Sequence, residues 1–390
     1  MSATHDPDRT TSAAAPLYLA FELGWTSWGL AFSTAPALPP RRVTIPARDL
    51  GSLRREIDRA RHRFGLPPSA PVRSCYEAGR DGFWLDRFLA ACGIDNLVVD
   101  SSSIEVNRRA RRAKSDAIDV AKLLNLLMRY NNGEREVWSV VNVSAPEDED
   151  RRQPHRDRDQ LVRERTEHSN RIKGLLAAIG LDIIVDERLL ERVGALRQWD
   201  GEPVPGELRE RIAREYQRWR LVDGQLGELG NRQRREVRDD GVAHVELVRR
   251  LLDLKGVGPV TAWTLVREVF GWRRIKNRRE LASLAGLTPS PYDSGETRRE
   301  QGISKAGNRR VRWAMIELAW LWLQYQPESE LSRWFRRRFG PGNARLRKTG
   351  IVAVARKLLI ALWKYLETGA VPAGATVSGA EEDRAPRKAS

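Results

Sequence analysis

Cysteine is scarce in this sequence of 390 residues. Only Cys75 and Cys92 are present, and neither belongs to a CxxC pair or a Cys/His cluster. A zinc site and a disulfide scaffold are therefore not expected. No apolar run reaches the roughly 18 residues that a membrane-spanning helix needs, and the polar N-terminus does not resemble a secretion signal. We therefore expect a cytoplasmic protein.

Acidic residues are too few to balance the basic ones. The 68 Lys and Arg residues exceed the 52 Asp and Glu residues, which gives a formal net charge of +16. A polyanionic partner is the leading expectation, because neutralising phosphates releases counterions and drives binding. The alternative is a protein with a generally basic surface. The 13 tryptophans favour nucleic acid slightly, since aromatic faces stack on unpaired bases.

The N-terminal part of the chain is predicted to be an α/β domain at 16–140, after a disordered tail at 1–15. Helices are predicted at 50–64, 83–92 and 116–130. Five short apolar runs predict strands, at 17–22, 27–32, 42–45, 72–76 and 96–99. Three consecutive strands followed by alternating helix and strand indicate a mixed sheet with flanking helices.

The remainder of the chain is predicted to be all-α. Dense alternating charge and a narrow apolar seam at 141–244 indicate a long coiled-coil hairpin, which favours self-association. A C-terminal domain is expected at 245–368 and a disordered tail at 369–390.

Within the C-terminal domain, helix 248–254, a turn with Gly256 and Gly258, and helix 260–270 resemble a helix-hairpin-helix motif. In such a motif, glycines let backbone N–H groups approach a phosphate. An ordinary interhelical turn is the alternative. Further along, a basic cluster is a candidate for binding the DNA backbone or for stabilising a phosphate in the transition state, and backbone binding is preferred: Lys305, Arg309, Arg310 and Arg312.

Four acidic residues are candidate metal ligands. Glu22 and Glu77 end predicted strands, and Asp116 and Asp119 are three residues apart on one side of a predicted helix. Acids that converge repel one another unless a cation neutralises them, and Mg²⁺ prefers carboxylate oxygens. Two such ions can activate a nucleophile and stabilise the leaving oxygen of a phosphodiester. Solvated surface carboxylates are the alternative.

Several motifs in a fixed order together resemble the DEDD transposases of bacterial insertion sequences. The resemblance covers roughly residues 17–367. The segments that carry it are Glu22, Tyr76-Glu77-Ala78-Gly79, KSDAIDVAKLL (114–124), NRIKGLL (170–176), LKGVGPVTA (254–262), LAGLTP (284–289), Ser294-Gly295 and GISKAGNRRVR (302–312).

This resemblance implies an RNase H-like, RuvC-type domain, a coiled coil and a C-terminal transposase domain. It implies that Glu22, Glu77, Asp116 and Asp119 hold Mg²⁺ and that Ser294 attacks the scissile phosphate of DNA. It also implies a guide, a bridge RNA that pairs with donor and target DNA. One departure concerns Glu22, because the family most often has Asp in a GIDVSK-like run.

Two other functions remain open at this stage. A RuvC-like nuclease would use the same acids with water as the nucleophile, and Ser294 would then lie in an ordinary turn. A non-catalytic nucleic-acid-binding protein would need no metal. For the transposase we expect a homo-oligomer, a dimer at least and a tetramer or other higher assembly on nucleic acid, because recombination must hold two duplexes together.

Overall fold

The computed structural model describes residues 15–104, 116–294 and 297–377. Within these ranges, the side chains of residues 102, 116–119, 291–294 and 297–301 lie outside the description. The chain divides into two compact units, Met1–Ser144 and Ala145–Ser390. Each unit is described by itself below.

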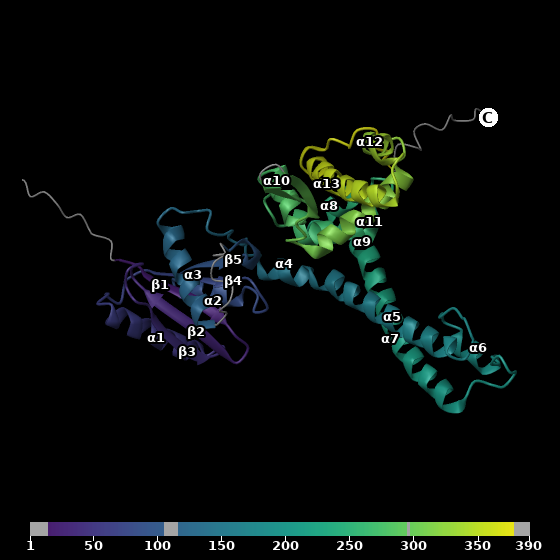
Figure 1. The fold of residues 1–390 in the computed structure, drawn as a ribbon, viewed down its shortest axis with the longest axis horizontal. Coiled ribbons are helices and arrows are strands. Elements are labelled where there is room, and N and C mark those ends of the chain that lie inside the picture. The colour runs from purple at the N-terminus through teal and green to yellow at the C-terminus, as the bar shows by residue number, and fades with distance from the viewer. Residues whose placement is uncertain (1–14, 105–115, 295–296, 378–390) are drawn as a thin grey trace, which may run out of the picture. The chain divides into compact units, whose positions relative to one another are not determined.

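The first unit is built on one five-stranded mixed sheet (Figure 1). Its strands are β1 (Leu17–Leu23), β2 (Ser27–Ser33), β3 (Arg41–Pro46), β4 (Val72–Glu77) and β5 (Asp95–Val99), in the order β3-β2-β1-β4-β5. The pairs β1–β2 and β2–β3 are antiparallel, while β4 runs parallel to both β1 and β5. The predicted mixed sheet is therefore confirmed.

Alternation along β1 separates the two faces of this sheet. Leu17, Leu19 and Phe21 pack with helices α1 (Leu50–Arg63) and α2 (Trp84–Ala91), whereas Tyr18 and Ala20 pack with helix α3 (Asp116–Asn131). Such period-two burial on both faces follows from a strand that is covered on each side. A short 3₁₀ turn, η1 (Ser101–Ser103), follows β5.

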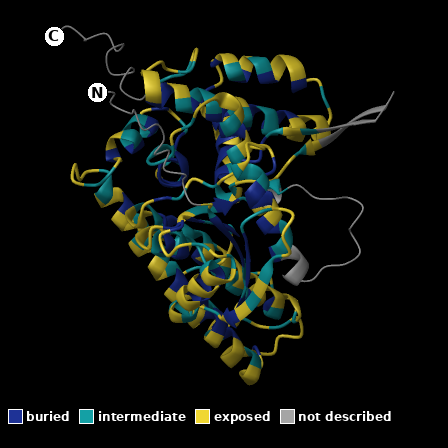
Figure 2. Cartoon of the chain, turned by 90° about the vertical axis from the view of Figure 1, so that its left-hand side faces the viewer, coloured by how far each residue is buried: buried dark blue, intermediate teal, exposed yellow. Residues whose placement is uncertain are grey.

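Two long helices form the start of the second unit. The long helices are α5 (Gln153–Ala177) and α7 (Gly206–Glu236). The short helix α4 (Pro146–Arg151) precedes α5, and the short helix α6 (Leu189–Ala195) precedes α7. Arg165 of α5 pairs with Asp223 at 2.8 Å, and His168 pairs with Glu215 at 2.7 Å. The residue numbers of the partners fall along α7 as they rise along α5, so the two helices are antiparallel. Figure 2 shows exposed and buried residues alternating along helices of the chain.

Helices around one apolar core make up the rest of this unit. They are α8 (Val245–Leu252), α9 (Pro259–Leu265), α10 (Arg278–Leu284), α11 (Arg309–Tyr325), α12 (Glu330–Phe339) and α13 (Ala344–Thr368). The predicted helix 260–270 is divided, because α9 passes at Val266 into a π-helical segment, η3 (Val266–Phe270). Short π-helical turns inside α-helices are rare and frequently occur at functional sites.

The polar segment around Ser294 differs from its prediction. This part of the chain was predicted to be all-α, but the structure has a hairpin of β6 (Pro289–Ser294) and β7 (Thr297–Ile303) with an irregular register near Pro291. Its sequence lacks an apolar alternation, which is why no strand was predicted. Across the described residues, no helix is long and apolar enough to cross a membrane.

Candidate functional site

Glu22 and Glu77 lie next to each other at the carboxyl ends of two parallel strands. Phe21 of β1 is in register with Tyr76 of β4, and each glutamate is the next residue along its strand. Both glutamates line one cavity of about 240 Å³ and are partly exposed. The structure therefore brings together two of the four predicted metal ligands.

The neighbours of Glu77 fix the end of β4. Tyr76 is fully buried, and its hydroxyl donates a hydrogen bond to the Gly82 carbonyl at 3.0 Å. Burial raises the pKa of this phenol, so the hydroxyl remains protonated and able to donate. Cys75 is also buried, which raises the pKa of its thiol and leaves it unreactive. The loop after Glu77 is thus anchored from within the core.

Asp116 and Asp119 belong to the first turn of α3, but their side chains lie outside the described residues. Val120 follows them, is buried, and shares with Glu22 the lining of a second cavity of about 560 Å³. Among the side chains that the structure describes, no three His, Cys, Asp or Glu residues form a metal-binding group. A four-carboxylate site therefore depends on the two aspartates and stays a prediction.

Ser294 is the last residue of β6 and is paired with Thr297 across the hairpin. Its side chain is outside the description, so the structure does not test its predicted role. What the structure does define is the base of the hairpin. The Ser304 N–H donates to the Thr288 carbonyl at 2.8 Å, and the Lys305 N–H donates to the Gly286 carbonyl at 3.2 Å.

Two glycines allow the LAGLTP and SKAGN motifs to interlock at this base. Gly286 has φ +64°, and a Cβ there would lie 2.1 Å from the Ala306 carbonyl oxygen. Gly307 has φ +101°, and a Cβ there would lie 2.4 Å from the Leu284 carbonyl oxygen. Only glycine fits such close approaches in this backbone conformation. The two motifs therefore act as one structural element.

The four residues of the basic cluster differ in their surroundings. Lys305 and Arg309 are exposed. Arg310 instead donates through Nε to Asp159 of α5 at 3.1 Å, and Arg312 donates to the Ala285 carbonyl at 3.2 Å. Lys305 and Arg309 are therefore the members best placed to contact a nucleic-acid backbone, while the other two join parts of the protein.

The two helices and the glycine turn that were predicted to resemble a helix-hairpin-helix motif are present as α8, a tight turn and α9. Gly256 has φ +93° and lies against Tyr325, whose Cβ would be 3.1 Å from an added Cβ. Gly258 is the extended residue that precedes α9. The turn is also held from the C-terminal side, because the Lys255 N–H donates to the Thr376 carbonyl at 3.3 Å and the Gln326 amide donates to the Lys255 carbonyl at 2.9 Å.

A buried glutamate in η3 connects the long helix α5 with the C-terminal helices. Glu268 is 1% exposed and accepts hydrogen bonds from His155 at 2.8 Å, from Arg156 at 2.9 and 3.0 Å, and from the Asn308 amide at 2.8 Å. Asn308 also caps α11 by accepting from the Arg310 N–H at 2.9 Å. Burial opposes ionisation of Glu268, but these hydrogen bonds outweigh it and hold its pKa well below the usual range.

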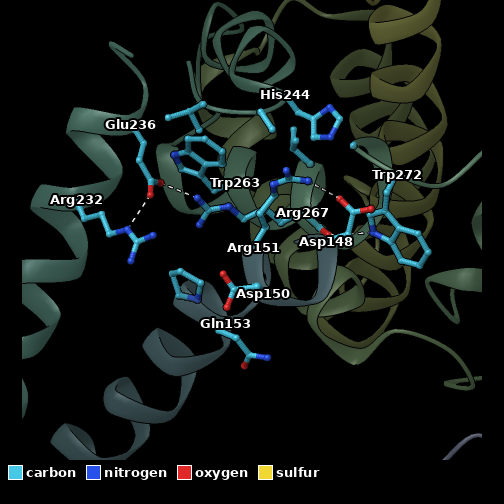
Figure 3. Close-up of a pocket in the computed structure, with 15 residues that line it drawn as sticks. Asp148, Asp150, Arg151, Gln153, Arg232, Glu236, His244, Trp263, Arg267 and Trp272 are labelled. Atoms are coloured by element: carbon cyan, nitrogen blue, oxygen red, sulfur yellow. Dashed lines mark hydrogen bonds and ion pairs between the residues drawn. The ribbon is translucent and has the colours of Figure 1, made fainter. Parts of the chain in front are cut away.

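Beside this network lies a cavity of about 320 Å³ (Figure 3). Arg267 donates to Glu236 at 2.6 Å and stacks over Trp263, with 4.1 Å between its guanidinium carbon and the ring centroid. Glu236 also accepts from Arg232 at 2.8 Å, and Asp148 pairs with Arg151 at 2.9 Å. The arginines that line the cavity are thus paired with carboxylates, and the cavity has no marked preference for an anion.

Sequence reasoning missed Glu268, His155 and Arg267. The available signal was the pair of charges inside the apolar segment Val266-Arg267-Glu268-Val269, which a buried helix does not normally carry. The partners of these charges are roughly a hundred residues away in sequence or at the end of α7, so spacing alone could not identify them.

Comparison with known proteins gives the family. Residues 248–334 match the model of the transposase IS116/IS110/IS902 family. The y4rJ protein of Sinorhizobium fredii, named as a transposase, is 43% identical over 325 residues, which are 79% of this chain and 80% of that protein. The transposase for insertion sequence element IS1328 of Yersinia enterocolitica is 26% identical over 222 residues, 56% of this chain and 63% of that protein.

These similarities are sufficient to assign the chain to a class. It is an insertion-sequence transposase, a class of protein whose partner is DNA. The chain belongs to the IS116/IS110/IS902 family of transposases. The resemblance that its motifs predicted is therefore confirmed at the level of the family.

Proposed function

We propose that this transposase cuts and rejoins DNA strands with Mg²⁺ bound at an RNase H-like first unit and with Ser294 as the nucleophile. The observation that carries the proposal is the position of Glu22 and Glu77, which end adjacent parallel strands and line the same cavity. The mixed order of the sheet and its flanking helices support the RNase H-like assignment.

The donor set suits a hard cation. Two carboxylates from neighbouring strands supply oxygen ligands, and Asp116 and Asp119 at the start of α3 would supply the others. Bound Mg²⁺ would stabilise charge on the phosphate oxygens during strand cleavage. The sheet edge would keep the carboxylates fixed, because both strands and the loop after β4 are anchored in the core.

Ser294 would form the covalent link. Its hydroxyl oxygen would bond to the scissile phosphorus while the bond from phosphorus to one deoxyribose oxygen breaks. The hydroxyl proton would pass to solvent and the departing oxygen would take up a proton. A hydroxyl on the acceptor strand would then displace the serine, which restores the enzyme and joins the strands.

The second unit would hold DNA mainly through its backbone. N–H groups of Gly256 and Gly258 at the turn before α9 are suited to a phosphate, and Lys305 and Arg309 are exposed beside the base of the hairpin. A bridge RNA is proposed as the guide. The net charge of +16 and the exposed arginines of α12 support binding of a second polyanion: Arg333, Arg336, Arg337 and Arg338.

The acids are tested by Glu77→Gln in the full-length protein. We expect loss of Mg²⁺-dependent strand cleavage and weaker Mg²⁺ binding in calorimetry, with an unchanged circular dichroism spectrum. Glu134→Gln, at an exposed glutamate of the same unit, is the matched control and should cleave normally. Unchanged cleavage by Glu77→Gln would refute the proposed metal site.

The serine is tested by trapping DNA on the protein. Denaturing electrophoresis of the wild type with labelled DNA should show a covalent adduct, and Ser294→Ala should lack it. Ser283→Ala, at an exposed serine of α10, should retain it. If Ser294→Ala cleaves normally while Glu77→Gln does not, water is the nucleophile and the protein acts as a nuclease.

The predicted partners can be tested on purified protein. RNA that co-purifies with the protein should be one structured noncoding species, and its sequence should pair with the DNA on both sides of the element. Light scattering should give a dimer at least, with a larger assembly once DNA and RNA are added. A monomer at high concentration would contradict the self-association proposed for α5 and α7.

A further inference from the structure

Three loops meet at the sheet edge that carries Glu22 and Glu77. The β1–β2 turn is closed by the Gly24 N–H, which donates to the Ser27 carbonyl at 3.0 Å. The β3–α1 loop is joined to this turn, because the Ala47 N–H donates to the Thr26 carbonyl at 2.9 Å. The β4–α2 loop completes the group and begins directly after Glu77.

An exposed tryptophan lies at the meeting point of these loops. Trp25 is 64% exposed, whereas Trp28, three residues later, is fully buried in the core. The guanidinium carbons of Arg48 and Arg80 lie 4.9 and 4.7 Å from the Trp25 ring centroid. What distinguishes Trp25 from other exposed tryptophans such as Trp199 is that two arginines lie over its ring, next to the predicted metal ligands.

A nearly buried carboxylate orients both arginines. The Asp81 side chain is 6% exposed and accepts from Arg48 at 3.2 Å and from Arg80 at 3.4 Å. Arg48 also donates to the Trp25 carbonyl at 3.4 Å, and its backbone is left-handed, with φ +66°. A non-glycine residue held in this conformation is uncommon and occurs preferentially at binding and catalytic sites. We call Trp25, Arg48, Arg80 and Asp81 the Trp25 cluster.

The Trp25 cluster borders both of the cavities that contain Glu22. Trp25 lines the cavity that Glu22 shares with Val120, and Arg80 and Asp81 line the cavity that Glu22 shares with Glu77. A DNA strand whose phosphodiester lies at the two glutamates must therefore pass beside the Trp25 cluster. Two arginines and one aspartate give the cluster a net positive charge, which suits a phosphate.

We propose that the Trp25 cluster binds an unpaired nucleotide of the DNA strand that is to be cut. The base stacks on the Trp25 ring, and Arg48 and Arg80 hold the adjoining phosphate. An unpaired base is required, because a base inside a duplex already has both of its faces stacked. Asp81 already holds both arginines in place before DNA binds, so that binding loses less side-chain conformational entropy. The inference rests on the proposed function for its location at the scissile phosphate.

The test measures DNA binding by the full-length protein in EDTA, so that neither metal nor cleavage contributes. The probes are a labelled single-stranded oligonucleotide and the same sequence in a duplex. Trp25→Ala should weaken single-strand binding by about tenfold, the usual effect of losing one stacked base, and leave duplex binding unchanged. Trp25→Phe should recover most of the affinity because it keeps an aromatic face.

One further variant is a control and another tests the phosphate contact. Trp199→Ala removes the tryptophan of the second unit that is 85% exposed and should leave single-strand binding unchanged. Arg80→Gln should lower the salt dependence of single-strand binding by about 0.7 in the logarithmic slope, as expected for one phosphate contact.

The proposal is overturned if Trp25→Ala binds the single strand as the wild type does, or if it weakens single strand and duplex equally. A Trp25-dependent preference for RNA over DNA of the same sequence would overturn DNA as the occupant. The two proposals fail separately. If Trp25→Ala loses single-strand binding while Glu77→Gln cleaves normally, only the metal site is refuted. If Trp25→Ala binds the single strand normally while Glu77→Gln does not cleave, only the Trp25 cluster is refuted.

Discussion

Replacement of Glu268 by glutamine should loosen the attachment of α5 to the C-terminal helices. The carboxylate accepts four hydrogen bonds and is 1% exposed, while the Arg156 side chain keeps 35% exposure. The glutamine amide would turn a donor towards the Arg156 or Asn308 donors and would remove the charge. Breaking a buried ion pair costs about 3–5 kcal/mol, and partial exposure of Arg156 reduces this to about 3 kcal/mol.

The effect has a defined pH dependence. Because the pKa of Glu268 is lowered in the folded protein, its contribution to stability is complete above the unfolded pKa, near 4.3, and is lost as the pH falls below that value. Each pH unit below it removes about 1.4 kcal/mol. The cost of Glu268→Gln should therefore fall from about 3 kcal/mol at about pH 5 to about 1 kcal/mol at about pH 3.

Hydrogen exchange in the full-length protein is the appropriate assay, because it reports the opening free energy of individual segments in a chain with two units. Peptides that cover η3 and the start of α11 should be less protected from exchange in Glu268→Gln than in the wild type, and peptides from β1 should be equally protected in both. Glu317→Gln, at an exposed position of α11, is the control. Equal protection in wild type and Glu268→Gln at both pH values would refute the reasoning.

Three further predictions concern the hairpin base and its surroundings. Gly286→Ala should lower the opening free energy around the hairpin base, measured by hydrogen exchange, by about 3 kcal/mol, whereas Gly302→Ala, also at positive φ but with no atom within 4 Å of the added Cβ, should cost about 1 kcal/mol. Asn308→Ala should cost about 2 kcal/mol by loss of the α11 cap and the Glu268 bond, seen as faster exchange at the start of α11. Arg309→Ala should lower the salt slope of DNA binding by about 0.9, and Arg310→Ala should leave it unchanged.

The first unit could be predicted well from its sequence. Each strand is a short apolar run bounded by turn residues, and Glu22 and Glu77 mark where two of these runs end. Parallel neighbours place their carboxyl ends at one edge, so the proximity of the two glutamates follows from the strand order. The positions of the Asp116 and Asp119 side chains do not follow in this way and remain a prediction.

The second unit could be predicted only in part. Helices α11 and α13 agree with the all-α prediction for this region, but β6 and β7 do not, because their polar residues carry no period-two pattern. Glu268 was missed because its stabilising partners come from distant segments. Trp25 was missed because an exposed tryptophan and a buried one look alike in a sequence, and only the packing of three loops distinguishes them.

The interlocked glycines at Gly286 and Gly307 have a consequence for how the hairpin is attached. The two strands of the hairpin start from a base where the backbone of Gly286 and of Gly307 lies against neighbouring carbonyl groups. These approaches are too close for any residue with a Cβ. A substitution in the hairpin that leaves both glycines in place should therefore not change how α10 and α11 are held against each other. The same contacts that join the two motifs thus also fix the points from which both strands of the hairpin begin.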